Sequence, residues 1–166
     1  MHNRVKDTAF LGLCVSLALG LAYIEALLPP LSTAVPGIKM GLPNIVLVFL
    51  LYRRGAVSAA TVSLLRLVLL LLIFGNVTHF MYGLAGGALS MAVMALLKRL
   101  NFLSVTGVSV AGAVTHNLGQ ILVAMWLMRT AAIGYYFVVL AVTGTVAGVF
   151  IGLCGSLLIR RIPNRW

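Results

Sequence analysis

The chain has 166 residues, of which 62% are hydrophobic and 8% are charged, and its formal net charge is +10. A soluble domain carries about 25% charged residues, so this composition excludes a water-exposed fold. The lysines and arginines cluster in pairs at the ends of apolar runs. This placement indicates membrane topology and argues against nucleic acid as the partner of the positive charge.

Six apolar segments can be marked along the chain. They are Thr8–Leu28, Gly41–Tyr52, Ala56–Phe74, His79–Leu97, Val105–Met128 and Tyr135–Ile159. Five of them have 19 to 25 residues, which is enough for a helix to cross a hydrocarbon core about 30 Å thick. The sequence therefore predicts an all-α, polytopic membrane protein with six transmembrane helices, in which residues 1–166 form a single integral membrane domain.

The second segment, Gly41–Tyr52, has 12 residues and is too short to cross, because a helix of this length spans roughly 18 Å. Its start at Pro43 should therefore lie at membrane depth. We expect residues 36–44 to form a re-entrant loop that lines a cavity, plugs the outer face, or does both. A helix start at Asn44, beside Lys39, attracts an anion.

Lysine and arginine are divided unequally between the two sides of the membrane. If the amino terminus is inside, the inner side holds nine of them: Arg4, Lys6, Arg53, Arg54, Lys98, Arg99, Arg160, Arg161 and Arg165. The outer side holds two, Lys39 and Arg129. Positive residues of short loops stay in the cytoplasm. We therefore predict a multi-pass protein of the bacterial inner membrane with both termini cytoplasmic.

Arg66 lies in the middle of Ala56–Phe74. A charged side chain at the bilayer centre costs at least about 2.5 kcal/mol, and it usually faces a cavity or a partner. The chain has only two acidic residues, Asp7 and Glu25, so the neutralising charge is expected to come with an anionic ligand. The alternative is that Glu25 pairs with Arg66 and makes it structural.

The fifth segment carries three polar residues, His116, Asn117 and Gln120, near mid-membrane. His116 and Gln120 are four residues apart and share a helix face, with Asn117 beside them. They form either an interhelical hydrogen-bond network or a polar binding wall. We favour the wall, because Arg66 lies at a similar depth. His79, in the outer turn between the third and fourth segments, is a further candidate.

Small residues recur at every fourth position in several segments, a pattern that lets helices approach closely within a membrane. The last segment has Gly144, Gly148 and Gly152, and the first has two such ladders, Gly12–Ser16–Gly20 and Cys14–Ala18–Ala22–Ala26. Packing within the bundle explains any single ladder. Two ladders on one helix indicate that the first helix also contacts a partner protein.

Little in the chain points to catalysis. One aspartate and one glutamate cannot supply the paired carboxylates of acid–base catalysis or an acidic magnesium site. The sequence contains no C-x-x-C motif and no G-x-x-x-x-G-K-[ST] loop. We expect no enzyme activity, no metal and no resident cofactor, and we expect a partner or an ion gradient to supply the energy for any pumping.

Three stretches, residues 36–46, 82–90 and 108–120, resemble the Gx transporter family, which is also described as heptaprenyl diphosphate synthase component I. This family is similar to the S components of energy-coupling factor (ECF) transporters. The resemblance implies a subunit that captures a small molecule, such as a vitamin, from outside. The site residues that it implies are Lys39, Asn44, Arg66, His116, Asn117 and Gln120. It also implies docking on a coupling subunit with two ATPases, through Ala18, Ala22 and Ala26.

Two other readings stay open. One is a membrane subunit of a quinone- or flavin-linked electron-transfer system, with a bound flavin or quinone. The other is an accessory membrane subunit of prenyl diphosphate synthesis, with an isoprenoid-like ligand. Prenyl transfer itself needs aspartate-rich magnesium sites, and Asp7 is the only aspartate of the chain.

Overall fold

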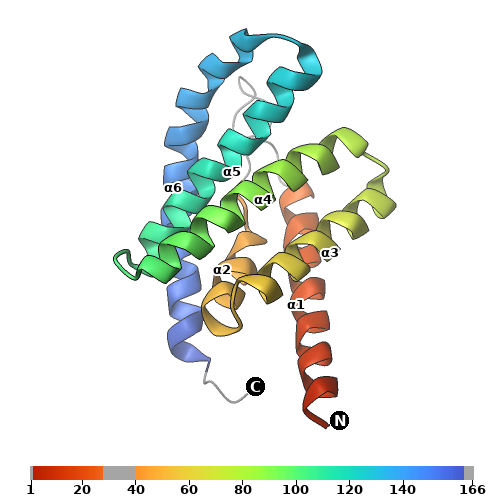
Figure 1. Ribbon diagram of the computed structural model, residues 1–166. Helices are drawn as coiled ribbons and strands as arrows, with labels where there is room; N and C mark the ends of the chain where they lie inside the picture. Colours follow the sequence, from red (N-terminus) through yellow and green to blue (C-terminus); the bar gives the residue numbers. More distant parts are fainter. Residues whose placement is uncertain (1, 28–39, 163–166) are drawn as a thin grey trace.

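The computed structural model describes residues 2–27 and 40–162, and this part of the chain is all-helical (Figure 1). Its elements are α1 (His2–Leu27), α2 (Asn44–Arg53), α3 (Ala56–Phe74), α4 (Val77–Leu100), α5 (Val105–Met128), the 3-10 helix η1 (Ala131–Tyr135) and α6 (Tyr136–Arg161). Five of the helices are long and apolar enough to cross a membrane, and α2 is the short exception. Lys39 and most of the expected re-entrant loop lie outside the described residues. Only the last residues of this loop, Met40 to Asn44, are described.

Helix boundaries follow the predicted apolar runs where glycine or a polar cap marks the end. α3 has the predicted bounds, with Gly55 before it and Gly75 after it. α1 begins at His2, six residues before the predicted Thr8. A helix that leaves the membrane continues through charged residues, so the apolar pattern marks the span and not the end of the helix.

The centre of the bundle is α2. All six residues from Val46 to Leu51 are buried, as expected for a helix that is apolar on every side. They form one hydrophobic core with residues of the other five α-helices: Cys14, Val15, Ala18, Ala59, Val62, Met91, Met94, Val108 and Ile151. This core occupies the half of the bundle where α2 ends.

We call that end of the bundle, which carries Arg53, Arg54 and Lys98, the basic end. α1 begins and α6 ends there (Figure 1). Arg54 Nη1 lies 2.9 Å from the carboxylate of Asp7, and the Lys98 ammonium donates to the carbonyl of Leu51 at 2.6 Å. These contacts hold α1 and α4 to α2, and the Lys98 ammonium satisfies a carbonyl group near the carboxyl end of α2.

Arg53 makes the corresponding link to α6. Its guanidinium donates hydrogen bonds to the backbone carbonyls of Ile159 and Ile162. The carbonyls at the end of α6 have no partners within the helix itself. The link therefore satisfies the end of α6 from a neighbouring helix.

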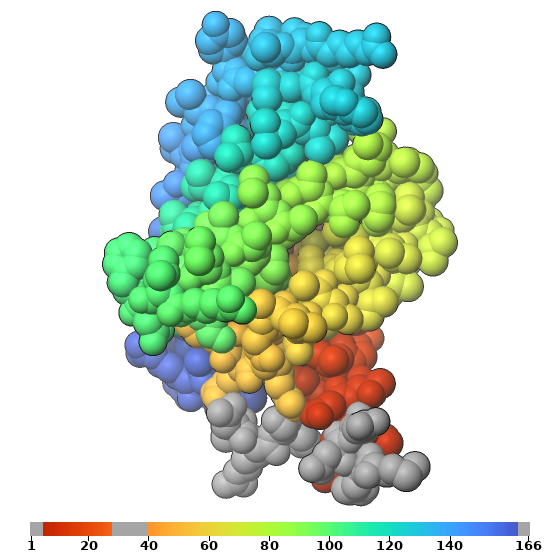
Figure 2. Space-filling model, in the orientation of Figure 1, coloured from red at the N-terminus to blue at the C-terminus, as the bar shows by residue number. Residues whose placement is uncertain are grey.

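Glycines set the packing of α5 between α4 and α6. A Cβ atom at Gly148 would lie 2.7 Å from Val110 Cα, and one at Gly152 would lie 2.6 Å from Thr106 Cα. On the other side of α5, a Cβ at Gly119 would lie 2.8 Å from the carbonyl oxygen of Ala85 in α4. The glycine ladder of α6 thus serves contacts inside the bundle. In Figure 2, α4 and α3 cross the middle of the face shown, with α5 above them and α1 and α2 below.

The two ladders of α1 face opposite ways, and this corrects one prediction. Ala18, which we expected at a partner interface, is 0% exposed and packs in the core. Ala22 and Ala26 line a cavity, and Ala26 is also exposed, so the correction applies to Ala18 alone. The other ladder, Gly12–Ser16–Gly20, is exposed, with no atom within 4 Å of a Cβ built at either glycine.

Candidate functional site: a cavity between the helices

A cavity of about 810 Å³ lies in the half of the bundle away from the basic end. Its volume falls in the range of about 300 to 1,000 Å³ that is typical of small-molecule sites. All six α-helices contribute to its lining. α2 begins at the cavity and ends at the basic end, so the shortness of this helix is what leaves the space open.

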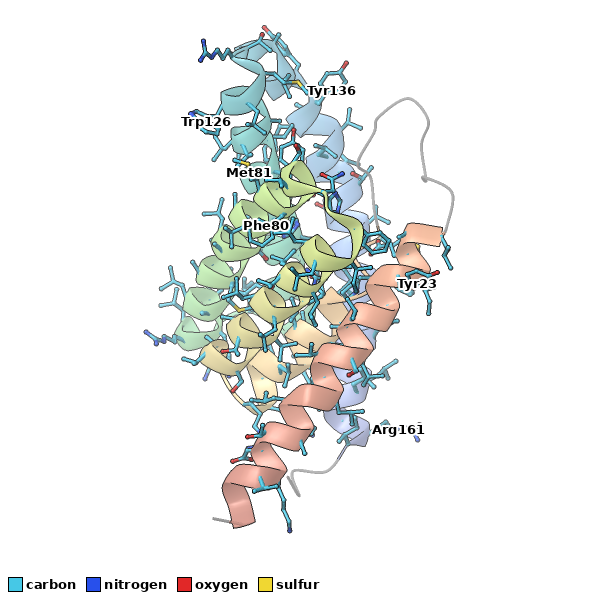
Figure 3. All side chains as sticks on the ribbon, turned by 90° about the vertical axis from the view of Figure 1, so that its right-hand side faces the viewer. Tyr23, Phe80, Met81, Trp126, Tyr136 and Arg161 are labelled. Carbon is cyan, nitrogen blue, oxygen red and sulfur yellow. The ribbon has the colours of Figure 1, made fainter. Side chains whose placement is uncertain are left out.

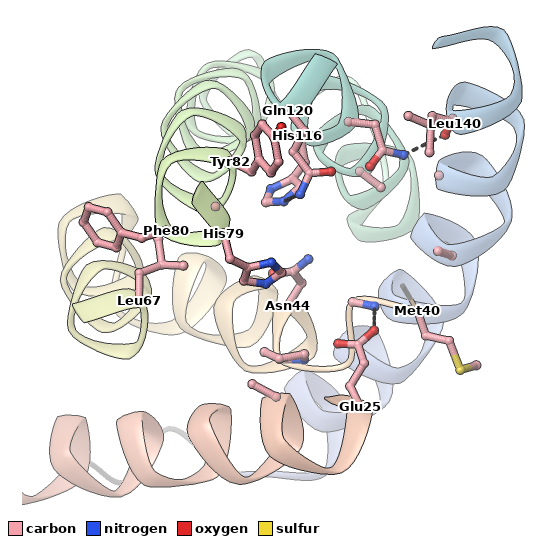
Figure 4. Close-up of a pocket in the computed structure, with 18 of the residues that line it drawn as sticks. Glu25, Met40, Asn44, Leu67, His79, Phe80, Tyr82, His116, Gln120 and Leu140 are labelled. Carbon is pink, nitrogen blue, oxygen red and sulfur yellow. Dashed lines mark hydrogen bonds between the residues drawn. The ribbon is translucent and has the colours of Figure 1, made fainter. Parts of the chain in front are cut away.

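The described part of the chain brings the predicted polar residues to this one cavity (Figure 4). They are Glu25 of α1, Asn44 of α2, Arg66 of α3, His79 of α4, and His116, Asn117 and Gln120 of α5. Lys39 lies outside the described residues. The helices converge so that residues nearly 100 positions apart in sequence share one space.

Arg66 is 8% exposed, and its Nε atom is buried with no hydrogen-bond partner among the described residues. Neither acid of the chain pairs with it in this part of the structure. Asp7 pairs with Arg54, and Glu25 accepts a hydrogen bond from the backbone N–H of Gly41. The described residues therefore show no ion pair between Glu25 and Arg66.

His116 and Gln120 form a hydrogen-bonded pair. Their Nε2 atoms lie 3.3 Å apart. Gly86 of α4 makes room for the imidazole, because a Cβ there would lie 3.0 Å from His116 Nε2. The two side chains therefore support each other on the cavity wall, and Tyr82 lies beside them in Figure 4.

Asn117 takes a more structural position than its neighbours. It lines the cavity, but its side-chain amide donates to the carbonyl oxygen of Leu140 in α6 at 2.6 Å. Gly144 leaves the space for this amide, since a Cβ there would lie 2.6 Å from Asn117 Nδ2. The sequence left two alternatives for the polar cluster, an interhelical hydrogen-bond network and a binding wall. At Asn117 the structure has an interhelical hydrogen bond.

The start of α2 does not offer the free backbone donors that we expected for an anion. The N–H groups of Asn44, Ile45 and Val46 donate to the carbonyls of residues 41, 42 and 43 at 2.8, 3.1 and 3.1 Å. Asn44 therefore contributes to the cavity through its side chain and through the dipole of the helix. Two buried side-chain donors have no partner among the described residues, Arg53 Nε and Arg66 Nε, and only Arg66 lines the cavity.

Sequence reasoning missed part of the cavity wall. Tyr82 and Tyr136 were not among the predicted site residues, but both line the cavity. The spacing of His79, Tyr82 and Gly86 places all three on one face of a helix, and this was the signal that could have found Tyr82. Figure 3 shows Tyr136 and Trp126 toward the end of the bundle opposite Arg161, where interfacial aromatics are expected.

A long apolar wall completes the site. It comes mainly from the second half of α3, the first half of α4 and the second half of α5, and includes Leu67, Leu70, Leu71, Phe74, Phe80, Ile121, Ala124 and Met128. Among the described residues, the cavity therefore joins one buried cation, one carboxylate, several neutral polar groups and a large apolar surface. No group of three or more potential metal ligands occurs among residues 2–27 and 40–162.

These features define an all-helical, multi-pass membrane protein with a cavity between its helices. The family model described as heptaprenyl diphosphate synthase component I matches residues 14–158. The chain belongs to this family, and the resemblance to the Gx transporter family is confirmed. No curated protein and no solved structure matches the chain.

Proposed function

We propose that this chain is the substrate-binding subunit of a membrane uptake transporter, similar to an ECF S component, and that it captures an anionic or polar-headed small molecule. The observation that supports this most is Arg66. It is buried at a cavity, and neither acidic side chain forms an ion pair with it in the described part of the chain. A buried charge without an ion pair is costly, and a ligand that supplies a negative group at Arg66 accounts for its presence.

The position of the cavity gives the direction of capture. The basic end carries the paired cations that favour the cytoplasmic side. If it is cytoplasmic, both termini face the cytoplasm of a bacterial cell and the cavity lies in the outer half of the inner membrane. A ligand then enters from outside, and the packed core below the cavity blocks its passage.

The proposed uptake function needs a partner that supplies energy, because the sequence has no phosphate-binding loop for a nucleotide. We place an ECF coupling subunit with two ATPases against the exposed Gly12–Ser16–Gly20 face of α1. Small residues on that face let a partner helix approach closely. This replaces Ala18, which is buried in the core, while Ala22 and Ala26 line the cavity.

The family description favours a second candidate, an accessory membrane subunit of prenyl diphosphate synthesis. Asp7, the only aspartate, pairs with Arg54 at the basic end. In that role the chain would hold an isoprenoid-like ligand in the cavity while another subunit performs the prenyl transfer.

Native mass spectrometry of the gently solubilised protein separates these functions. We expect a small bound molecule and two ATPases in the wild-type complex. Arg66→Gln should lose the molecule, and Arg99→Gln, a matched change of an exposed arginine, should keep it. Co-purification of a soluble prenyl synthase without ATPases would instead support the accessory role. Visible flavin or quinone absorbance would support the electron-transfer reading.

A further inference from the structure

Among the described residues, the lining of the cavity has one fixed positive and one fixed negative side chain. Arg66 and Glu25 both line it, and they come from α3 and α1. Among the described lining residues, the remaining polar side chains are neutral groups or histidines. A ligand with one negative charge can therefore be matched by Arg66, whereas a second negative group has to share the cavity with the Glu25 carboxylate.

The unpartnered donor of Arg66 also limits the geometry of recognition. Arg66 Nε is buried without a hydrogen bond in the described part of the chain. A guanidinium presents Nε and a terminal nitrogen as a planar fork, which matches the two oxygens of a carboxylate or a phosphate. A carboxylate carries one charge, but a phosphate monoester carries about 1.5 to 2 at neutral pH. The Glu25 carboxylate in the same cavity opposes the larger charge of a phosphate more than the single charge of a carboxylate, and this favours the carboxylate.

The rest of the ligand has to suit an apolar wall. Leu70 and Phe74 lie one and two helical turns beyond Arg66 on α3, and both line the cavity. Leu67 and Leu71 line it as well. A molecule anchored at Arg66 thus meets a continuous apolar strip along α3.

We propose that the cavity takes an amphipathic monocarboxylate, with its carboxylate on the Arg66 guanidinium and its apolar body along α3, and that Glu25 disfavours a second negative group. This substrate class rests on the proposed binding function of the cavity. It excludes strongly charged ligands such as diphosphates from the same position.

Three probes with one shared body test the charge class: 4-phenylbutyrate, 4-phenylbutan-1-ol and 4-phenylbutyl phosphate. Each is titrated by calorimetry into ligand-free protein in nanodiscs of zwitterionic lipid. We expect the carboxylate to bind about 10- to 100-fold more tightly than the alcohol, as is typical of a hydrogen-bonded charge pair. The phosphate ester should bind more weakly than the carboxylate.

Four variants assign the effect to residues. Arg66→Gln should remove the advantage of the carboxylate over the alcohol, Arg66→Lys should restore part of it, and Arg99→Gln should leave it unchanged. Glu25→Gln keeps an acceptor for the Gly41 N–H and should improve binding of the phosphate ester by about 10-fold. Thermal unfolding of each ligand-free variant shows whether it is folded.

Equal binding of the alcohol and the carboxylate would overturn the proposal, as would tighter binding of the phosphate ester to the wild-type protein. Failure of all three probes would overturn the apolar-body assignment. None of these results touches the uptake function, which depends on the ligand and the ATPases that co-purify with the protein.

Discussion

The carboxylate of Glu25, at the end of α1, accepts a hydrogen bond from the backbone N–H of Gly41, just before α2. Both residues line the cavity. Gly41 has a φ of +73°, a conformation that glycine adopts readily and other residues rarely adopt. The pair fixes the point at which the chain enters α2 and holds Asn44 at the cavity.

Gly41→Ala should destabilise the protein by about 1 to 2 kcal/mol, because a left-handed backbone is unfavourable for alanine. The new Cβ would also lie 3.0 Å from Asn44 Nδ2. Thermal unfolding in nanodiscs measures the change. Glu25→Ala should lower the midpoint more than Glu25→Gln, which retains an acceptor oxygen. Equal midpoints for these two variants and the wild type would show that the Glu25–Gly41 bond does not contribute.

Asn117 and Gly144 should behave as a coupled pair. Asn117→Ala removes the bond to Leu140, and Gly144→Ala places a Cβ 2.6 Å from Asn117 Nδ2. In a double-mutant cycle, the two changes should be less damaging together than the sum of the single changes, by about 0.5 to 3 kcal/mol.

Gly148→Ala provides the control for this cycle. It crowds Val110 and Ala113 of α5, away from the Asn117 amide. Its effect should add to that of Asn117→Ala. Additive behaviour of Gly144→Ala as well would contradict the coupling and return Asn117 to the set of residues available to a ligand.

The two faces of α1 give a matched test of the partner surface. Gly20→Leu changes an exposed position with no atom within 4 Å, so the midpoint of unfolding should stay unchanged. Co-purification of the ATPases should be lost, because a bulky side chain keeps a partner helix at a distance. Ala18→Leu overpacks the core and should destabilise the protein by about 1 to 3 kcal/mol. Retention of the ATPases by Gly20→Leu would place the partner elsewhere.

Cysteine labelling tests the orientation. In a Cys14→Ala, Cys154→Ala background, Ala131→Cys at the turn between α5 and α6 should react with an impermeant maleimide in intact cells. Phe102→Cys, between α4 and α5, should react after lysis only. Both positions are exposed, so access to the reagent and not burial decides the result. The reverse pattern would invert the topology and the direction of capture.

The membrane-spanning helices could be predicted because apolar length and charged ends are local properties of the sequence. α3 and α5 have the predicted bounds, and Arg66 was identifiable as a charge without enough acids to balance it. Residues such as Asn44, Arg66 and His116 were grouped by their depth. Depth is shared when helices are parallel, so this grouping placed them at one cavity.

Pairing between helices could not be predicted in the same way. Whether Asn117 faces a ligand or Leu140 depends on how α5 is rotated against α6. Which ladder of α1 faces inward depends on the contact of α1 with α2 and α3. Both questions concern the rotation of a helix about its axis, and an apolar helix in a membrane carries little amphipathic signal that reports it.

Because α2 is short, the molecule has two halves at different depths. The two halves differ in how far substitutions of their side chains alter stability. Around Val46–Leu51 the helices meet a close-packed core, and substitutions there alter stability. Beyond the first residue of α2 the same helices surround open space, where side chains can change size without disturbing that core. A family built on this plan can therefore diversify its ligands on one fold, and differences in specificity between members should gather in the half that α2 does not reach.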